Sequence, residues 1–161
     1  MYHRVVTALG RSFAAAALVW AALLPLATYA ASRTHLDAMT ASFTVVVYAV
    51  GALVCHQLPA RSFHVWGAQM PVCARCTGIY FGAALGAVIA LARLAEVPWV
   101  RTRPQSIAVI AVVPAAATLV FEWTTGVTPS NAVRFASGLW LGGVLAALVV
   151  AATTLSKREV N

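Results

Sequence analysis

Long apolar runs without charged residues constrain this chain more than any other feature of its sequence. The first run covers residues 12–31, which are 20 residues without a charge. A helix of that length spans about 30 Å, the thickness of the hydrocarbon core of a bilayer. A cleaved signal peptide is the competing interpretation, although the apolar part of such a signal is normally only about 7–15 residues long. We therefore expect this run to cross a membrane as an α-helix.

Three further runs have a similar apolar character and cover residues 77–95, 106–122 and 133–155. A fifth run, residues 38–54, is shorter and contains several hydroxyl side chains. Such a segment either spans or forms a re-entrant or interfacial helix. We predict an all-α integral membrane helix bundle within a single membrane domain, residues 1–161. It contains four transmembrane helices and one short, re-entrant or spanning helix.

The composition excludes a soluble domain. Of the 161 residues, 61% are hydrophobic and only 9% are charged, whereas about a quarter of the residues of soluble domains are charged. The net charge is +7, but the basic residues fall at the ends of apolar runs and form no basic face with interleaved aromatic residues. Nucleic acid is therefore not expected as a partner. The expected partner is the lipid bilayer, and a protein partner or a second copy of the chain stays open.

The basic residues also indicate topology, because Lys and Arg concentrate on the cytoplasmic side. If residues 38–54 do not span and the N-terminus is inside, seven basic residues lie inside: Arg4, Arg11, Arg93, Arg101, Arg103, Lys157 and Arg158. Four then lie outside: Arg33, Arg61, Arg75 and Arg134. If residues 38–54 do span, the division becomes five inside and six outside. The rule favours four spans, with the polar loop of residues 55–76 facing outward.

This loop, residues 55–76, contains all three cysteines of the chain. Cys73 and Cys76 form a C-x-x-C pair, and Cys55 is followed by His56. Three sulfur atoms and one imidazole are a known tetrahedral ligand set for zinc. We therefore predict Cys55, His56, Cys73 and Cys76 as ligands of a metal, zinc or iron, with His64 as an alternative nitrogen ligand.

Two other interpretations of the cysteines stay open. The chain could be a membrane thiol–disulfide oxidoreductase with Cys73 and Cys76 as the catalytic pair, because a helix N-terminus and Arg75 both favour a thiolate. Alternatively, the cysteines are structural, as a disulfide or as buried thiols, in a non-catalytic subunit or scaffold. The sequence does not decide whether the chain is an enzyme.

Polar residues near the same membrane face form a second candidate group. Glu122 ends one apolar run and Arg134 begins the next, so a tight turn would bring them together as an ion pair between two helices. Their alternative role is to reach into the cysteine site. The candidate substrate- or cofactor-binding residues are Arg61, Arg75, Glu122, Asn131 and Arg134.

Glycines recur every four residues in two of the runs: Gly78, Gly82 and Gly86 in one, Gly138 and Gly142 in the other. Small residues at this spacing let two helix backbones approach closely in a membrane. We predict that they mark helix packing.

Together these motifs resemble a known family. Cys-His-Gln at 55–57, Pro-x-Cys-x-Arg-Cys-x-Gly-x-Tyr-x-Gly at 71–82 and Ser-Asn-x-x-Arg at 130–134 are similar to the predicted bacterial membrane proteins of the domain of unknown function 2085. The resemblance covers about residues 54–143. It implies a multi-pass protein of the bacterial cell (inner) membrane whose motifs act as one unit, and it implies no particular activity.

Overall fold

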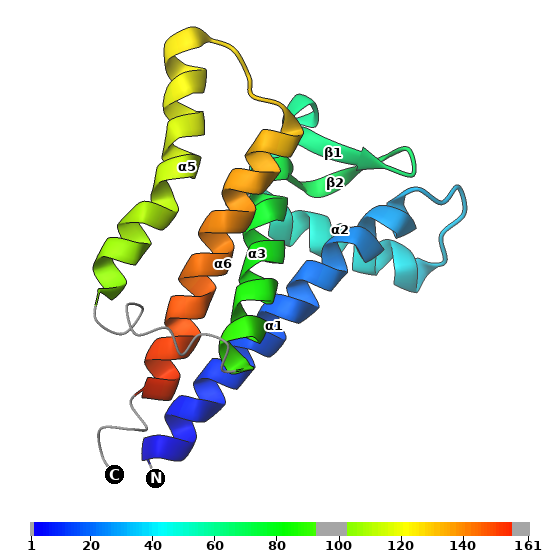
Figure 1. The fold of residues 1–161 in the computed structure, drawn as a ribbon. Coiled ribbons are helices and arrows are strands. Elements are labelled where there is room, and N and C mark those ends of the chain that lie inside the picture. The colour runs from blue at the N-terminus through cyan, green and yellow to red at the C-terminus, as the bar shows by residue number, and fades with distance from the viewer. Residues whose placement is uncertain (1, 93–102, 156–161) are drawn as a thin grey trace.

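The computed structural model describes residues 2–92 and 103–155 (Figure 1). Within these ranges the elements are α1 (Tyr2–Ala31), α2 (Ala38–Val54), η1 (Pro59–Arg61), β1 (Ser62–Val65), β2 (Ala68–Cys73), α3 (Ala74–Leu91), α5 (Pro104–Thr125) and α6 (Asn131–Leu155). The fold is a helix bundle with one small β-hairpin at its end. The predicted all-α membrane bundle is therefore confirmed.

Four of the described helices are long and apolar enough to cross a membrane. Their apolar segments are Ala8–Ala31, Ala74–Leu91, Pro104–Thr125 and Asn131–Thr153. They run alternately up and down. The C-termini of α1 and α5 and the N-termini of α3 and α6 therefore lie at the same end of the bundle (Figure 1). We call this end, which also carries the hairpin, the hairpin end.

The ends of the helices follow from local chain chemistry rather than from hydropathy. Cys73, in extended conformation, is the N-cap of α3, which therefore begins three residues before the apolar run. Pro104 lies in the first turn of α5, where its missing N–H costs no hydrogen bond. Gly126 ends the same helix in the left-handed conformation, with φ of 69°. Residues 93–95 of the predicted run lie outside the described residues.

The helices α3 and α6 make the closest contact of the bundle. A Cβ atom added to Gly78 would lie 2.1 Å from the carbonyl oxygen of Phe135, and one added to Gly82 would lie 2.2 Å from that of Leu139. Likewise, a Cβ atom added to Gly142 of α6 would lie 2.0 Å from the carbonyl oxygen of Ile79 of α3. Backbone thus packs against backbone on both sides, as the glycine spacing predicted. This contact fixes the start of α3 against the start of α6.

A second packing contact joins α1 to this pair. Ala14 of α1 is buried in a cluster with Ala87 of α3 and with Ala146 and Val150 of α6. Near the hairpin end, Leu24 of the same helix is also fully buried. The three helices α1, α3 and α6 therefore form the core, whereas α5 packs mainly on α6.

The short helix α2 runs back across the hairpin end instead of adding a fifth crossing (Figure 1). Asp37 caps its N-terminus by accepting a hydrogen bond from the backbone N–H of Thr40. Val47 and Gly51 are buried against the rest of the protein, while Val46 and Leu53 are 60% and 84% exposed. An apolar helix in this position fits the lipid interface. Among the described residues, α2 is the apolar helix that is shorter than the four spanning ones, and its place in the membrane stays a prediction.

The segment after α2, which the sequence suggested to be a loop, contains a hairpin. Strands β1 and β2 pair antiparallel, with Ser62 opposite Cys73 and Val65 opposite Ala68. Trp66 and Gly67 form a two-residue turn in which φ is positive at both positions, 55° and 81°, as a type I′ turn requires. The hairpin returns the chain to the end of α2, and so brings the cysteines that flank it together.

Candidate metal centre and the acid–arginine cluster

The three cysteines lie at the ends of three different elements. Cys55 directly follows α2 in an extended conformation, with φ of −144°. Cys73 ends β2 and caps α3, and Cys76 lies in the first turn of that helix. Because the hairpin closes residues 55–73 into a loop, all three thiols meet at the same point. We call them the thiol cluster.

The sulfur atoms of Cys55, Cys73 and Cys76 all lie within 4.8 Å of one another. The backbone N–H of Cys73 donates a hydrogen bond to the sulfur of Cys55, at 3.2 Å. All three residues are free cysteines. This hydrogen bond fixes the Cys55 sulfur beside the start of α3. The cluster therefore presents three soft donor atoms at a spacing that one ion could bridge.

Apolar and aromatic side chains enclose the thiol cluster from the side of α1. Cys55 is 8% exposed and packs with Leu24, Met70 and Val72. Trp20 of α1 and Tyr80 of α3 contact the same cluster, and their rings meet edge to face with centroids 5.9 Å apart. This packing holds the sulfur atoms in place and limits the access of water.

The two histidines of the loop lie outside the thiol cluster. His56 follows Cys55, but its side chain is exposed and is not part of the group of clustered donor atoms. Successive residues of an extended chain point to opposite sides, so a buried Cys55 directs His56 outward. His64 on β1 is exposed as well. The structure thus assembles three of the four predicted ligands.

The surroundings of Cys73 lower the pKa of its thiol. A hydrogen bond from the Cys76 thiol lowers the pKa of Cys73 to about 5, and contacts with Cys55 and with the backbone N–H groups of Arg75 and Cys76 act in the same direction. Partial burial opposes them. The N-terminal position on α3 adds the positive end of the helix dipole. Cys73 is therefore a thiolate at neutral pH, as a metal ligand or nucleophile must be.

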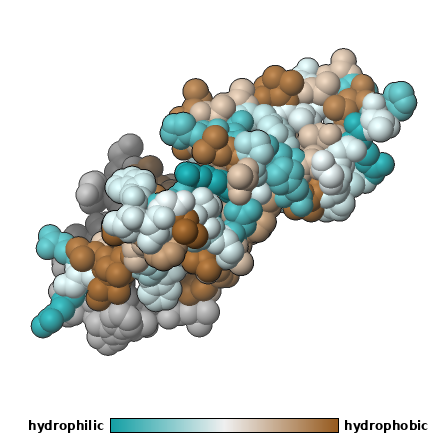
Figure 2. All heavy atoms as spheres, turned by 90° about the horizontal axis from the view of Figure 1, so that it is seen from above, coloured by the Kyte–Doolittle hydropathy of each residue, from teal (hydrophilic) through white to brown (hydrophobic). Residues whose placement is uncertain are grey.

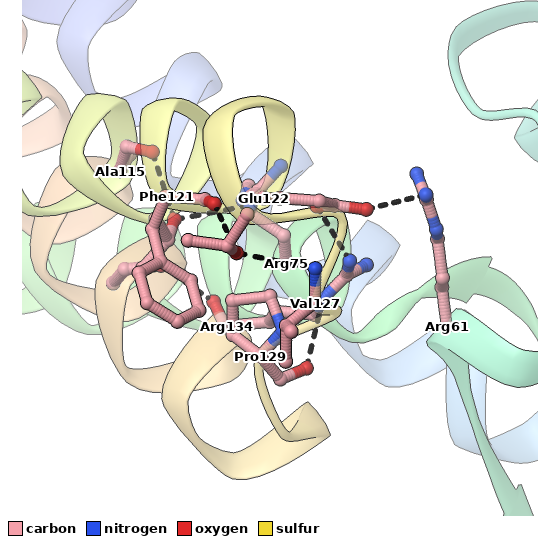
Figure 3. Close-up of polar contacts among 11 residues, drawn as sticks. Arg61, Arg75, Ala115, Phe121, Glu122, Val127, Pro129 and Arg134 are labelled. Atoms are coloured by element: carbon pink, nitrogen blue, oxygen red, sulfur yellow. Dashed lines mark hydrogen bonds and ion pairs between the residues drawn. The ribbon is translucent and has the colours of Figure 1, made fainter.

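The second predicted group forms around Glu122, near the end of α5 (Figure 3). Its carboxylate binds the guanidinium of Arg134 at 2.7 Å and forms a second ion pair with Arg61 of η1. Arg134 is 1% exposed and also donates from Nε to the carbonyl oxygen of Pro129 at 3.2 Å. The expected pairing of Glu122 with Arg134 is present, and Arg61 joins it from the hairpin segment.

Arg75 and Asn131 connect this group to its surroundings. Arg75, between the two cysteines of α3, donates to the hydroxyl of Thr118 on α5 at 3.0 Å. Asn131 donates from its amide to the carbonyl oxygen of Ser62 at 3.1 Å. We call Arg61, Arg75, Glu122 and Arg134 the acid–arginine cluster. It lies beside the thiol cluster but contributes no atom to it.

Several structural residues of the site were missed by sequence reasoning. The amide of Gln57 donates to the carbonyl oxygens of Tyr48 and Pro71, at 2.8 and 2.7 Å, and so ties α2 to β2. Gln57 has a φ of 49°, which no pattern in the sequence indicates. Thr118 had a usable signal, because it lies four residues before Glu122 and thus on the same face of an otherwise apolar helix.

At the hairpin end, hydrophilic residues lie among hydrophobic ones (Figure 2). Polar and apolar side chains thus alternate over this face of the protein. Such a mixture is typical of a surface at the boundary between lipid and water.

Comparison with known proteins gives two archaeal relatives, both uncharacterized. One, from Methanocaldococcus jannaschii, is 52% identical over 46 residues, which are 29% of this chain and 30% of that protein. Another, from Methanothermobacter thermautotrophicus, is 57% identical over 30 residues, 19% of this chain and 27% of that protein. The matched part thus spans less than a third of either relative. Both come from archaea, whereas the resemblance was to bacterial proteins. No solved structure matches the chain.

The profile of the family described as predicted membrane protein DUF2085 matches residues 55–148. The match begins at the first cysteine and extends into α6, so it contains the thiol cluster and the acid–arginine cluster. It covers more than half of the chain, and with four apolar helices of spanning length this makes a multi-pass membrane protein. The chain therefore belongs to the DUF2085 family of predicted membrane proteins.

Proposed function

We propose that the thiol cluster binds one metal ion. The observation that carries the proposal is the convergence of three sulfur atoms, on Cys55, Cys73 and Cys76, within 4.8 Å. Ligand sulfur atoms lie about 2.3 Å from zinc, so two of them at corners of a tetrahedron are about 3.8 Å apart. A small contraction of the cluster would reach that geometry. Three soft thiolates favour zinc or iron over hard cations such as magnesium or calcium.

The proposed site has three protein ligands and one open position, because His56 points away from the cluster. A closed structural zinc site normally has four protein ligands, whereas a site that exchanges ligands keeps one position free. A water molecule or a substrate group would occupy that position. This arrangement supports a binding or reactive role of the metal rather than a purely structural one.

We further propose that the hairpin end faces outward from the cell (inner) membrane. If the four apolar helices span with the N-terminus inside, the order of the basic residues along the sequence gives seven inside and four outside, as the positive-inside rule expects. The bacterial inner membrane stays the expected location. A protein partner or a second copy of the chain also stays an expectation, and nucleic acid is not proposed.

Elemental analysis of the protein purified in detergent, without chelator or added metal, tests the metal site. About one zinc or iron per chain is expected in the wild type and in His56→Ala, and none in Cys73→Ser. Loss of metal in His56→Ala would show that the histidine is a ligand after all. Absence of metal from the wild type, also after incubation with zinc under reducing conditions, would contradict the proposal.

The acidity of Cys73 supports a second candidate, thiol–disulfide exchange. The Cys73 thiolate would attack a substrate disulfide and form a mixed disulfide with one of its sulfur atoms. Cys76 would then lose its proton and attack the sulfur of Cys73, which leaves a Cys73–Cys76 disulfide and a substrate reduced to two thiols. Mass spectrometry distinguishes this candidate from metal binding. Turnover by metal-free protein with a Cys73–Cys76 disulfide as product would favour exchange.

A further inference from the structure

The acid–arginine cluster has more positive than negative charge. Arg61 and Arg134 both pair with Glu122, and Arg75 binds the hydroxyl of Thr118, one helical turn before Glu122 on α5. Two guanidinium groups therefore pair with one carboxylate and the third, on Arg75, lies about one helical turn away, so the four side chains have a net charge of about +2. Among the residues that the structure describes, no other acidic side chain forms an ion pair with this cluster.

The excess charge is concentrated on Arg75. The Nε atom of Arg75 is buried and has no hydrogen-bond partner, and Thr118, its partner through the terminal nitrogen, is neutral. A buried donor of a charged group without an acceptor is costly, and so is a charge at membrane depth without a counter-ion. Glu122 does not relieve this imbalance, because its carboxylate pairs with Arg61 and Arg134.

We propose that the acid–arginine cluster is a binding site for a phosphate group. A phosphate offers several strong acceptor oxygens and a negative charge, which match the forked donors of arginine. Arg75 supplies the unpartnered donor, and Arg61, whose side chain is 42% exposed, supplies the route from the surface. Arg61 lies at the hairpin end, where both lipid headgroups and dissolved anions can reach an exposed guanidinium.

This site is distinct from the thiol cluster. Arg75 lies between Cys73 and Cys76 in sequence, but it extends toward α5 while the cysteines pack with residues of α1 and the hairpin. No atom of the proposed phosphate site is a proposed metal ligand. The two proposals can therefore fail independently.

The test measures phosphate binding by the full-length protein in a neutral detergent. Two probes distinguish the possible sources of the phosphate group. Phosphatidylglycerol retention, counted by native mass spectrometry, reports on a lipid headgroup, and calorimetric titration with inorganic phosphate reports on a free anion. The variants are Arg75→Gln and Arg61→Gln. The matched control is Arg33→Gln, because Arg33 lies at the same end of the bundle but stacks on Tyr29, outside the cluster.

One probe is expected to bind with one phosphate group per chain. Both cluster variants should weaken that binding by about tenfold or more, since each removes a charge-assisted hydrogen bond, and the control should change it by less than about twofold. Retained lipid would assign the site to a headgroup, and titratable phosphate would assign it to a free anion. The proposal is overturned if neither probe binds, or if a correctly folded Arg61→Gln binds as well as the control.

Discussion

Replacing Glu122 by glutamine should be among the most destabilising single changes in this protein. The substitution conserves size but removes the charge that neutralises Arg134, which is only 1% exposed and bound at 2.7 Å. Removing one partner of a buried ion pair typically costs about 3–5 kcal/mol, because the other charge stays buried without compensation. The glutamine carbonyl can still accept one hydrogen bond, and Arg134 keeps its bond to Pro129. We therefore expect a loss of about 3 kcal/mol, near the lower limit of that range.

Arg61 also loses its partner in this variant, but its side chain is 42% exposed. An exposed ion pair contributes at most about 1 kcal/mol, so most of the effect must come from Arg134. The assay is reversible unfolding by sodium dodecyl sulfate in mixed micelles, followed by circular dichroism. Thr124→Ala is the matched control. It changes an exposed side chain two residues later on the same helix and should alter stability by less than about 0.5 kcal/mol.

A double variant separates a lost charge pair from a badly fitting side chain. If uncompensated charge is the cause, Glu122→Leu combined with Arg134→Met should be far less destabilising than Glu122→Gln alone, because no buried charge remains. The reasoning is refuted if Glu122→Gln unfolds at the same detergent fraction as the control. It is also refuted if the double variant loses as much stability as the single one.

Three further predictions concern packing, acidity and the hairpin. Gly142→Ala should destabilise the bundle by about 1–3 kcal/mol, because the new Cβ would lie 2.0 Å from a backbone oxygen of α3. In the same unfolding assay Gly143→Ala should be close to neutral, because its Cβ would lie 3.4 Å from the nearest atom, the carbonyl oxygen of Gly82. In metal-free protein, alkylation of Cys73 by iodoacetamide should keep its full rate as the pH falls from 9 and decline only near pH 5, since its pKa is lowered to about 5. The same midpoint in Cys76→Ala would contradict the cause given for that pKa, because the hydrogen bond from Cys76 would be gone. Gln57→Ala removes the two hydrogen bonds through which this side chain ties α2 to β2, and it should lower the stability of the protein by about 1–3 kcal/mol. Faster hydrogen exchange confined to α2 and the hairpin would confirm this prediction, and unchanged exchange would contradict it.

The membrane helices could be predicted from sequence because a long run of apolar, uncharged residues rarely forms anything other than a membrane-spanning helix. Their ends could be predicted less well, since caps and not hydropathy determine them. The start of α3 shows this: Ala74, Arg75 and Cys76 are helical because Cys73 caps the chain there, whereas the predicted apolar run begins only at Thr77. The hairpin could not be predicted, because its strands are short and β2 contains Pro71.

The candidate site was predictable to the extent that short-range geometry determines it. The spacing of Cys73 and Cys76 places both thiols near the start of one helix, and the turn before Arg134 brings it to Glu122. The position of His56 outside the cluster has an equally local reason, because Cys55 leaves α2 in an extended conformation and the next side chain points away. The link between Arg75 and Thr118 joins residues 43 positions apart, and no pattern of the sequence indicates that pairing.

The glycine contact between α3 and α6 also affects how the protein can be made. Membrane proteins are synthesised from the N-terminus, and α5 emerges between the two partners of this contact. The glycine face of α3 therefore has no helix partner until α6 is inserted, and lipid covers this face until then. A chain that stops before α6 would lack both this backbone contact and Arg134, although α1 and the hairpin could still pack around the thiol cluster. Assembly of the acid–arginine cluster, which needs Arg134 of α6, is thus a late event in biosynthesis, set by the order of the helices along the chain.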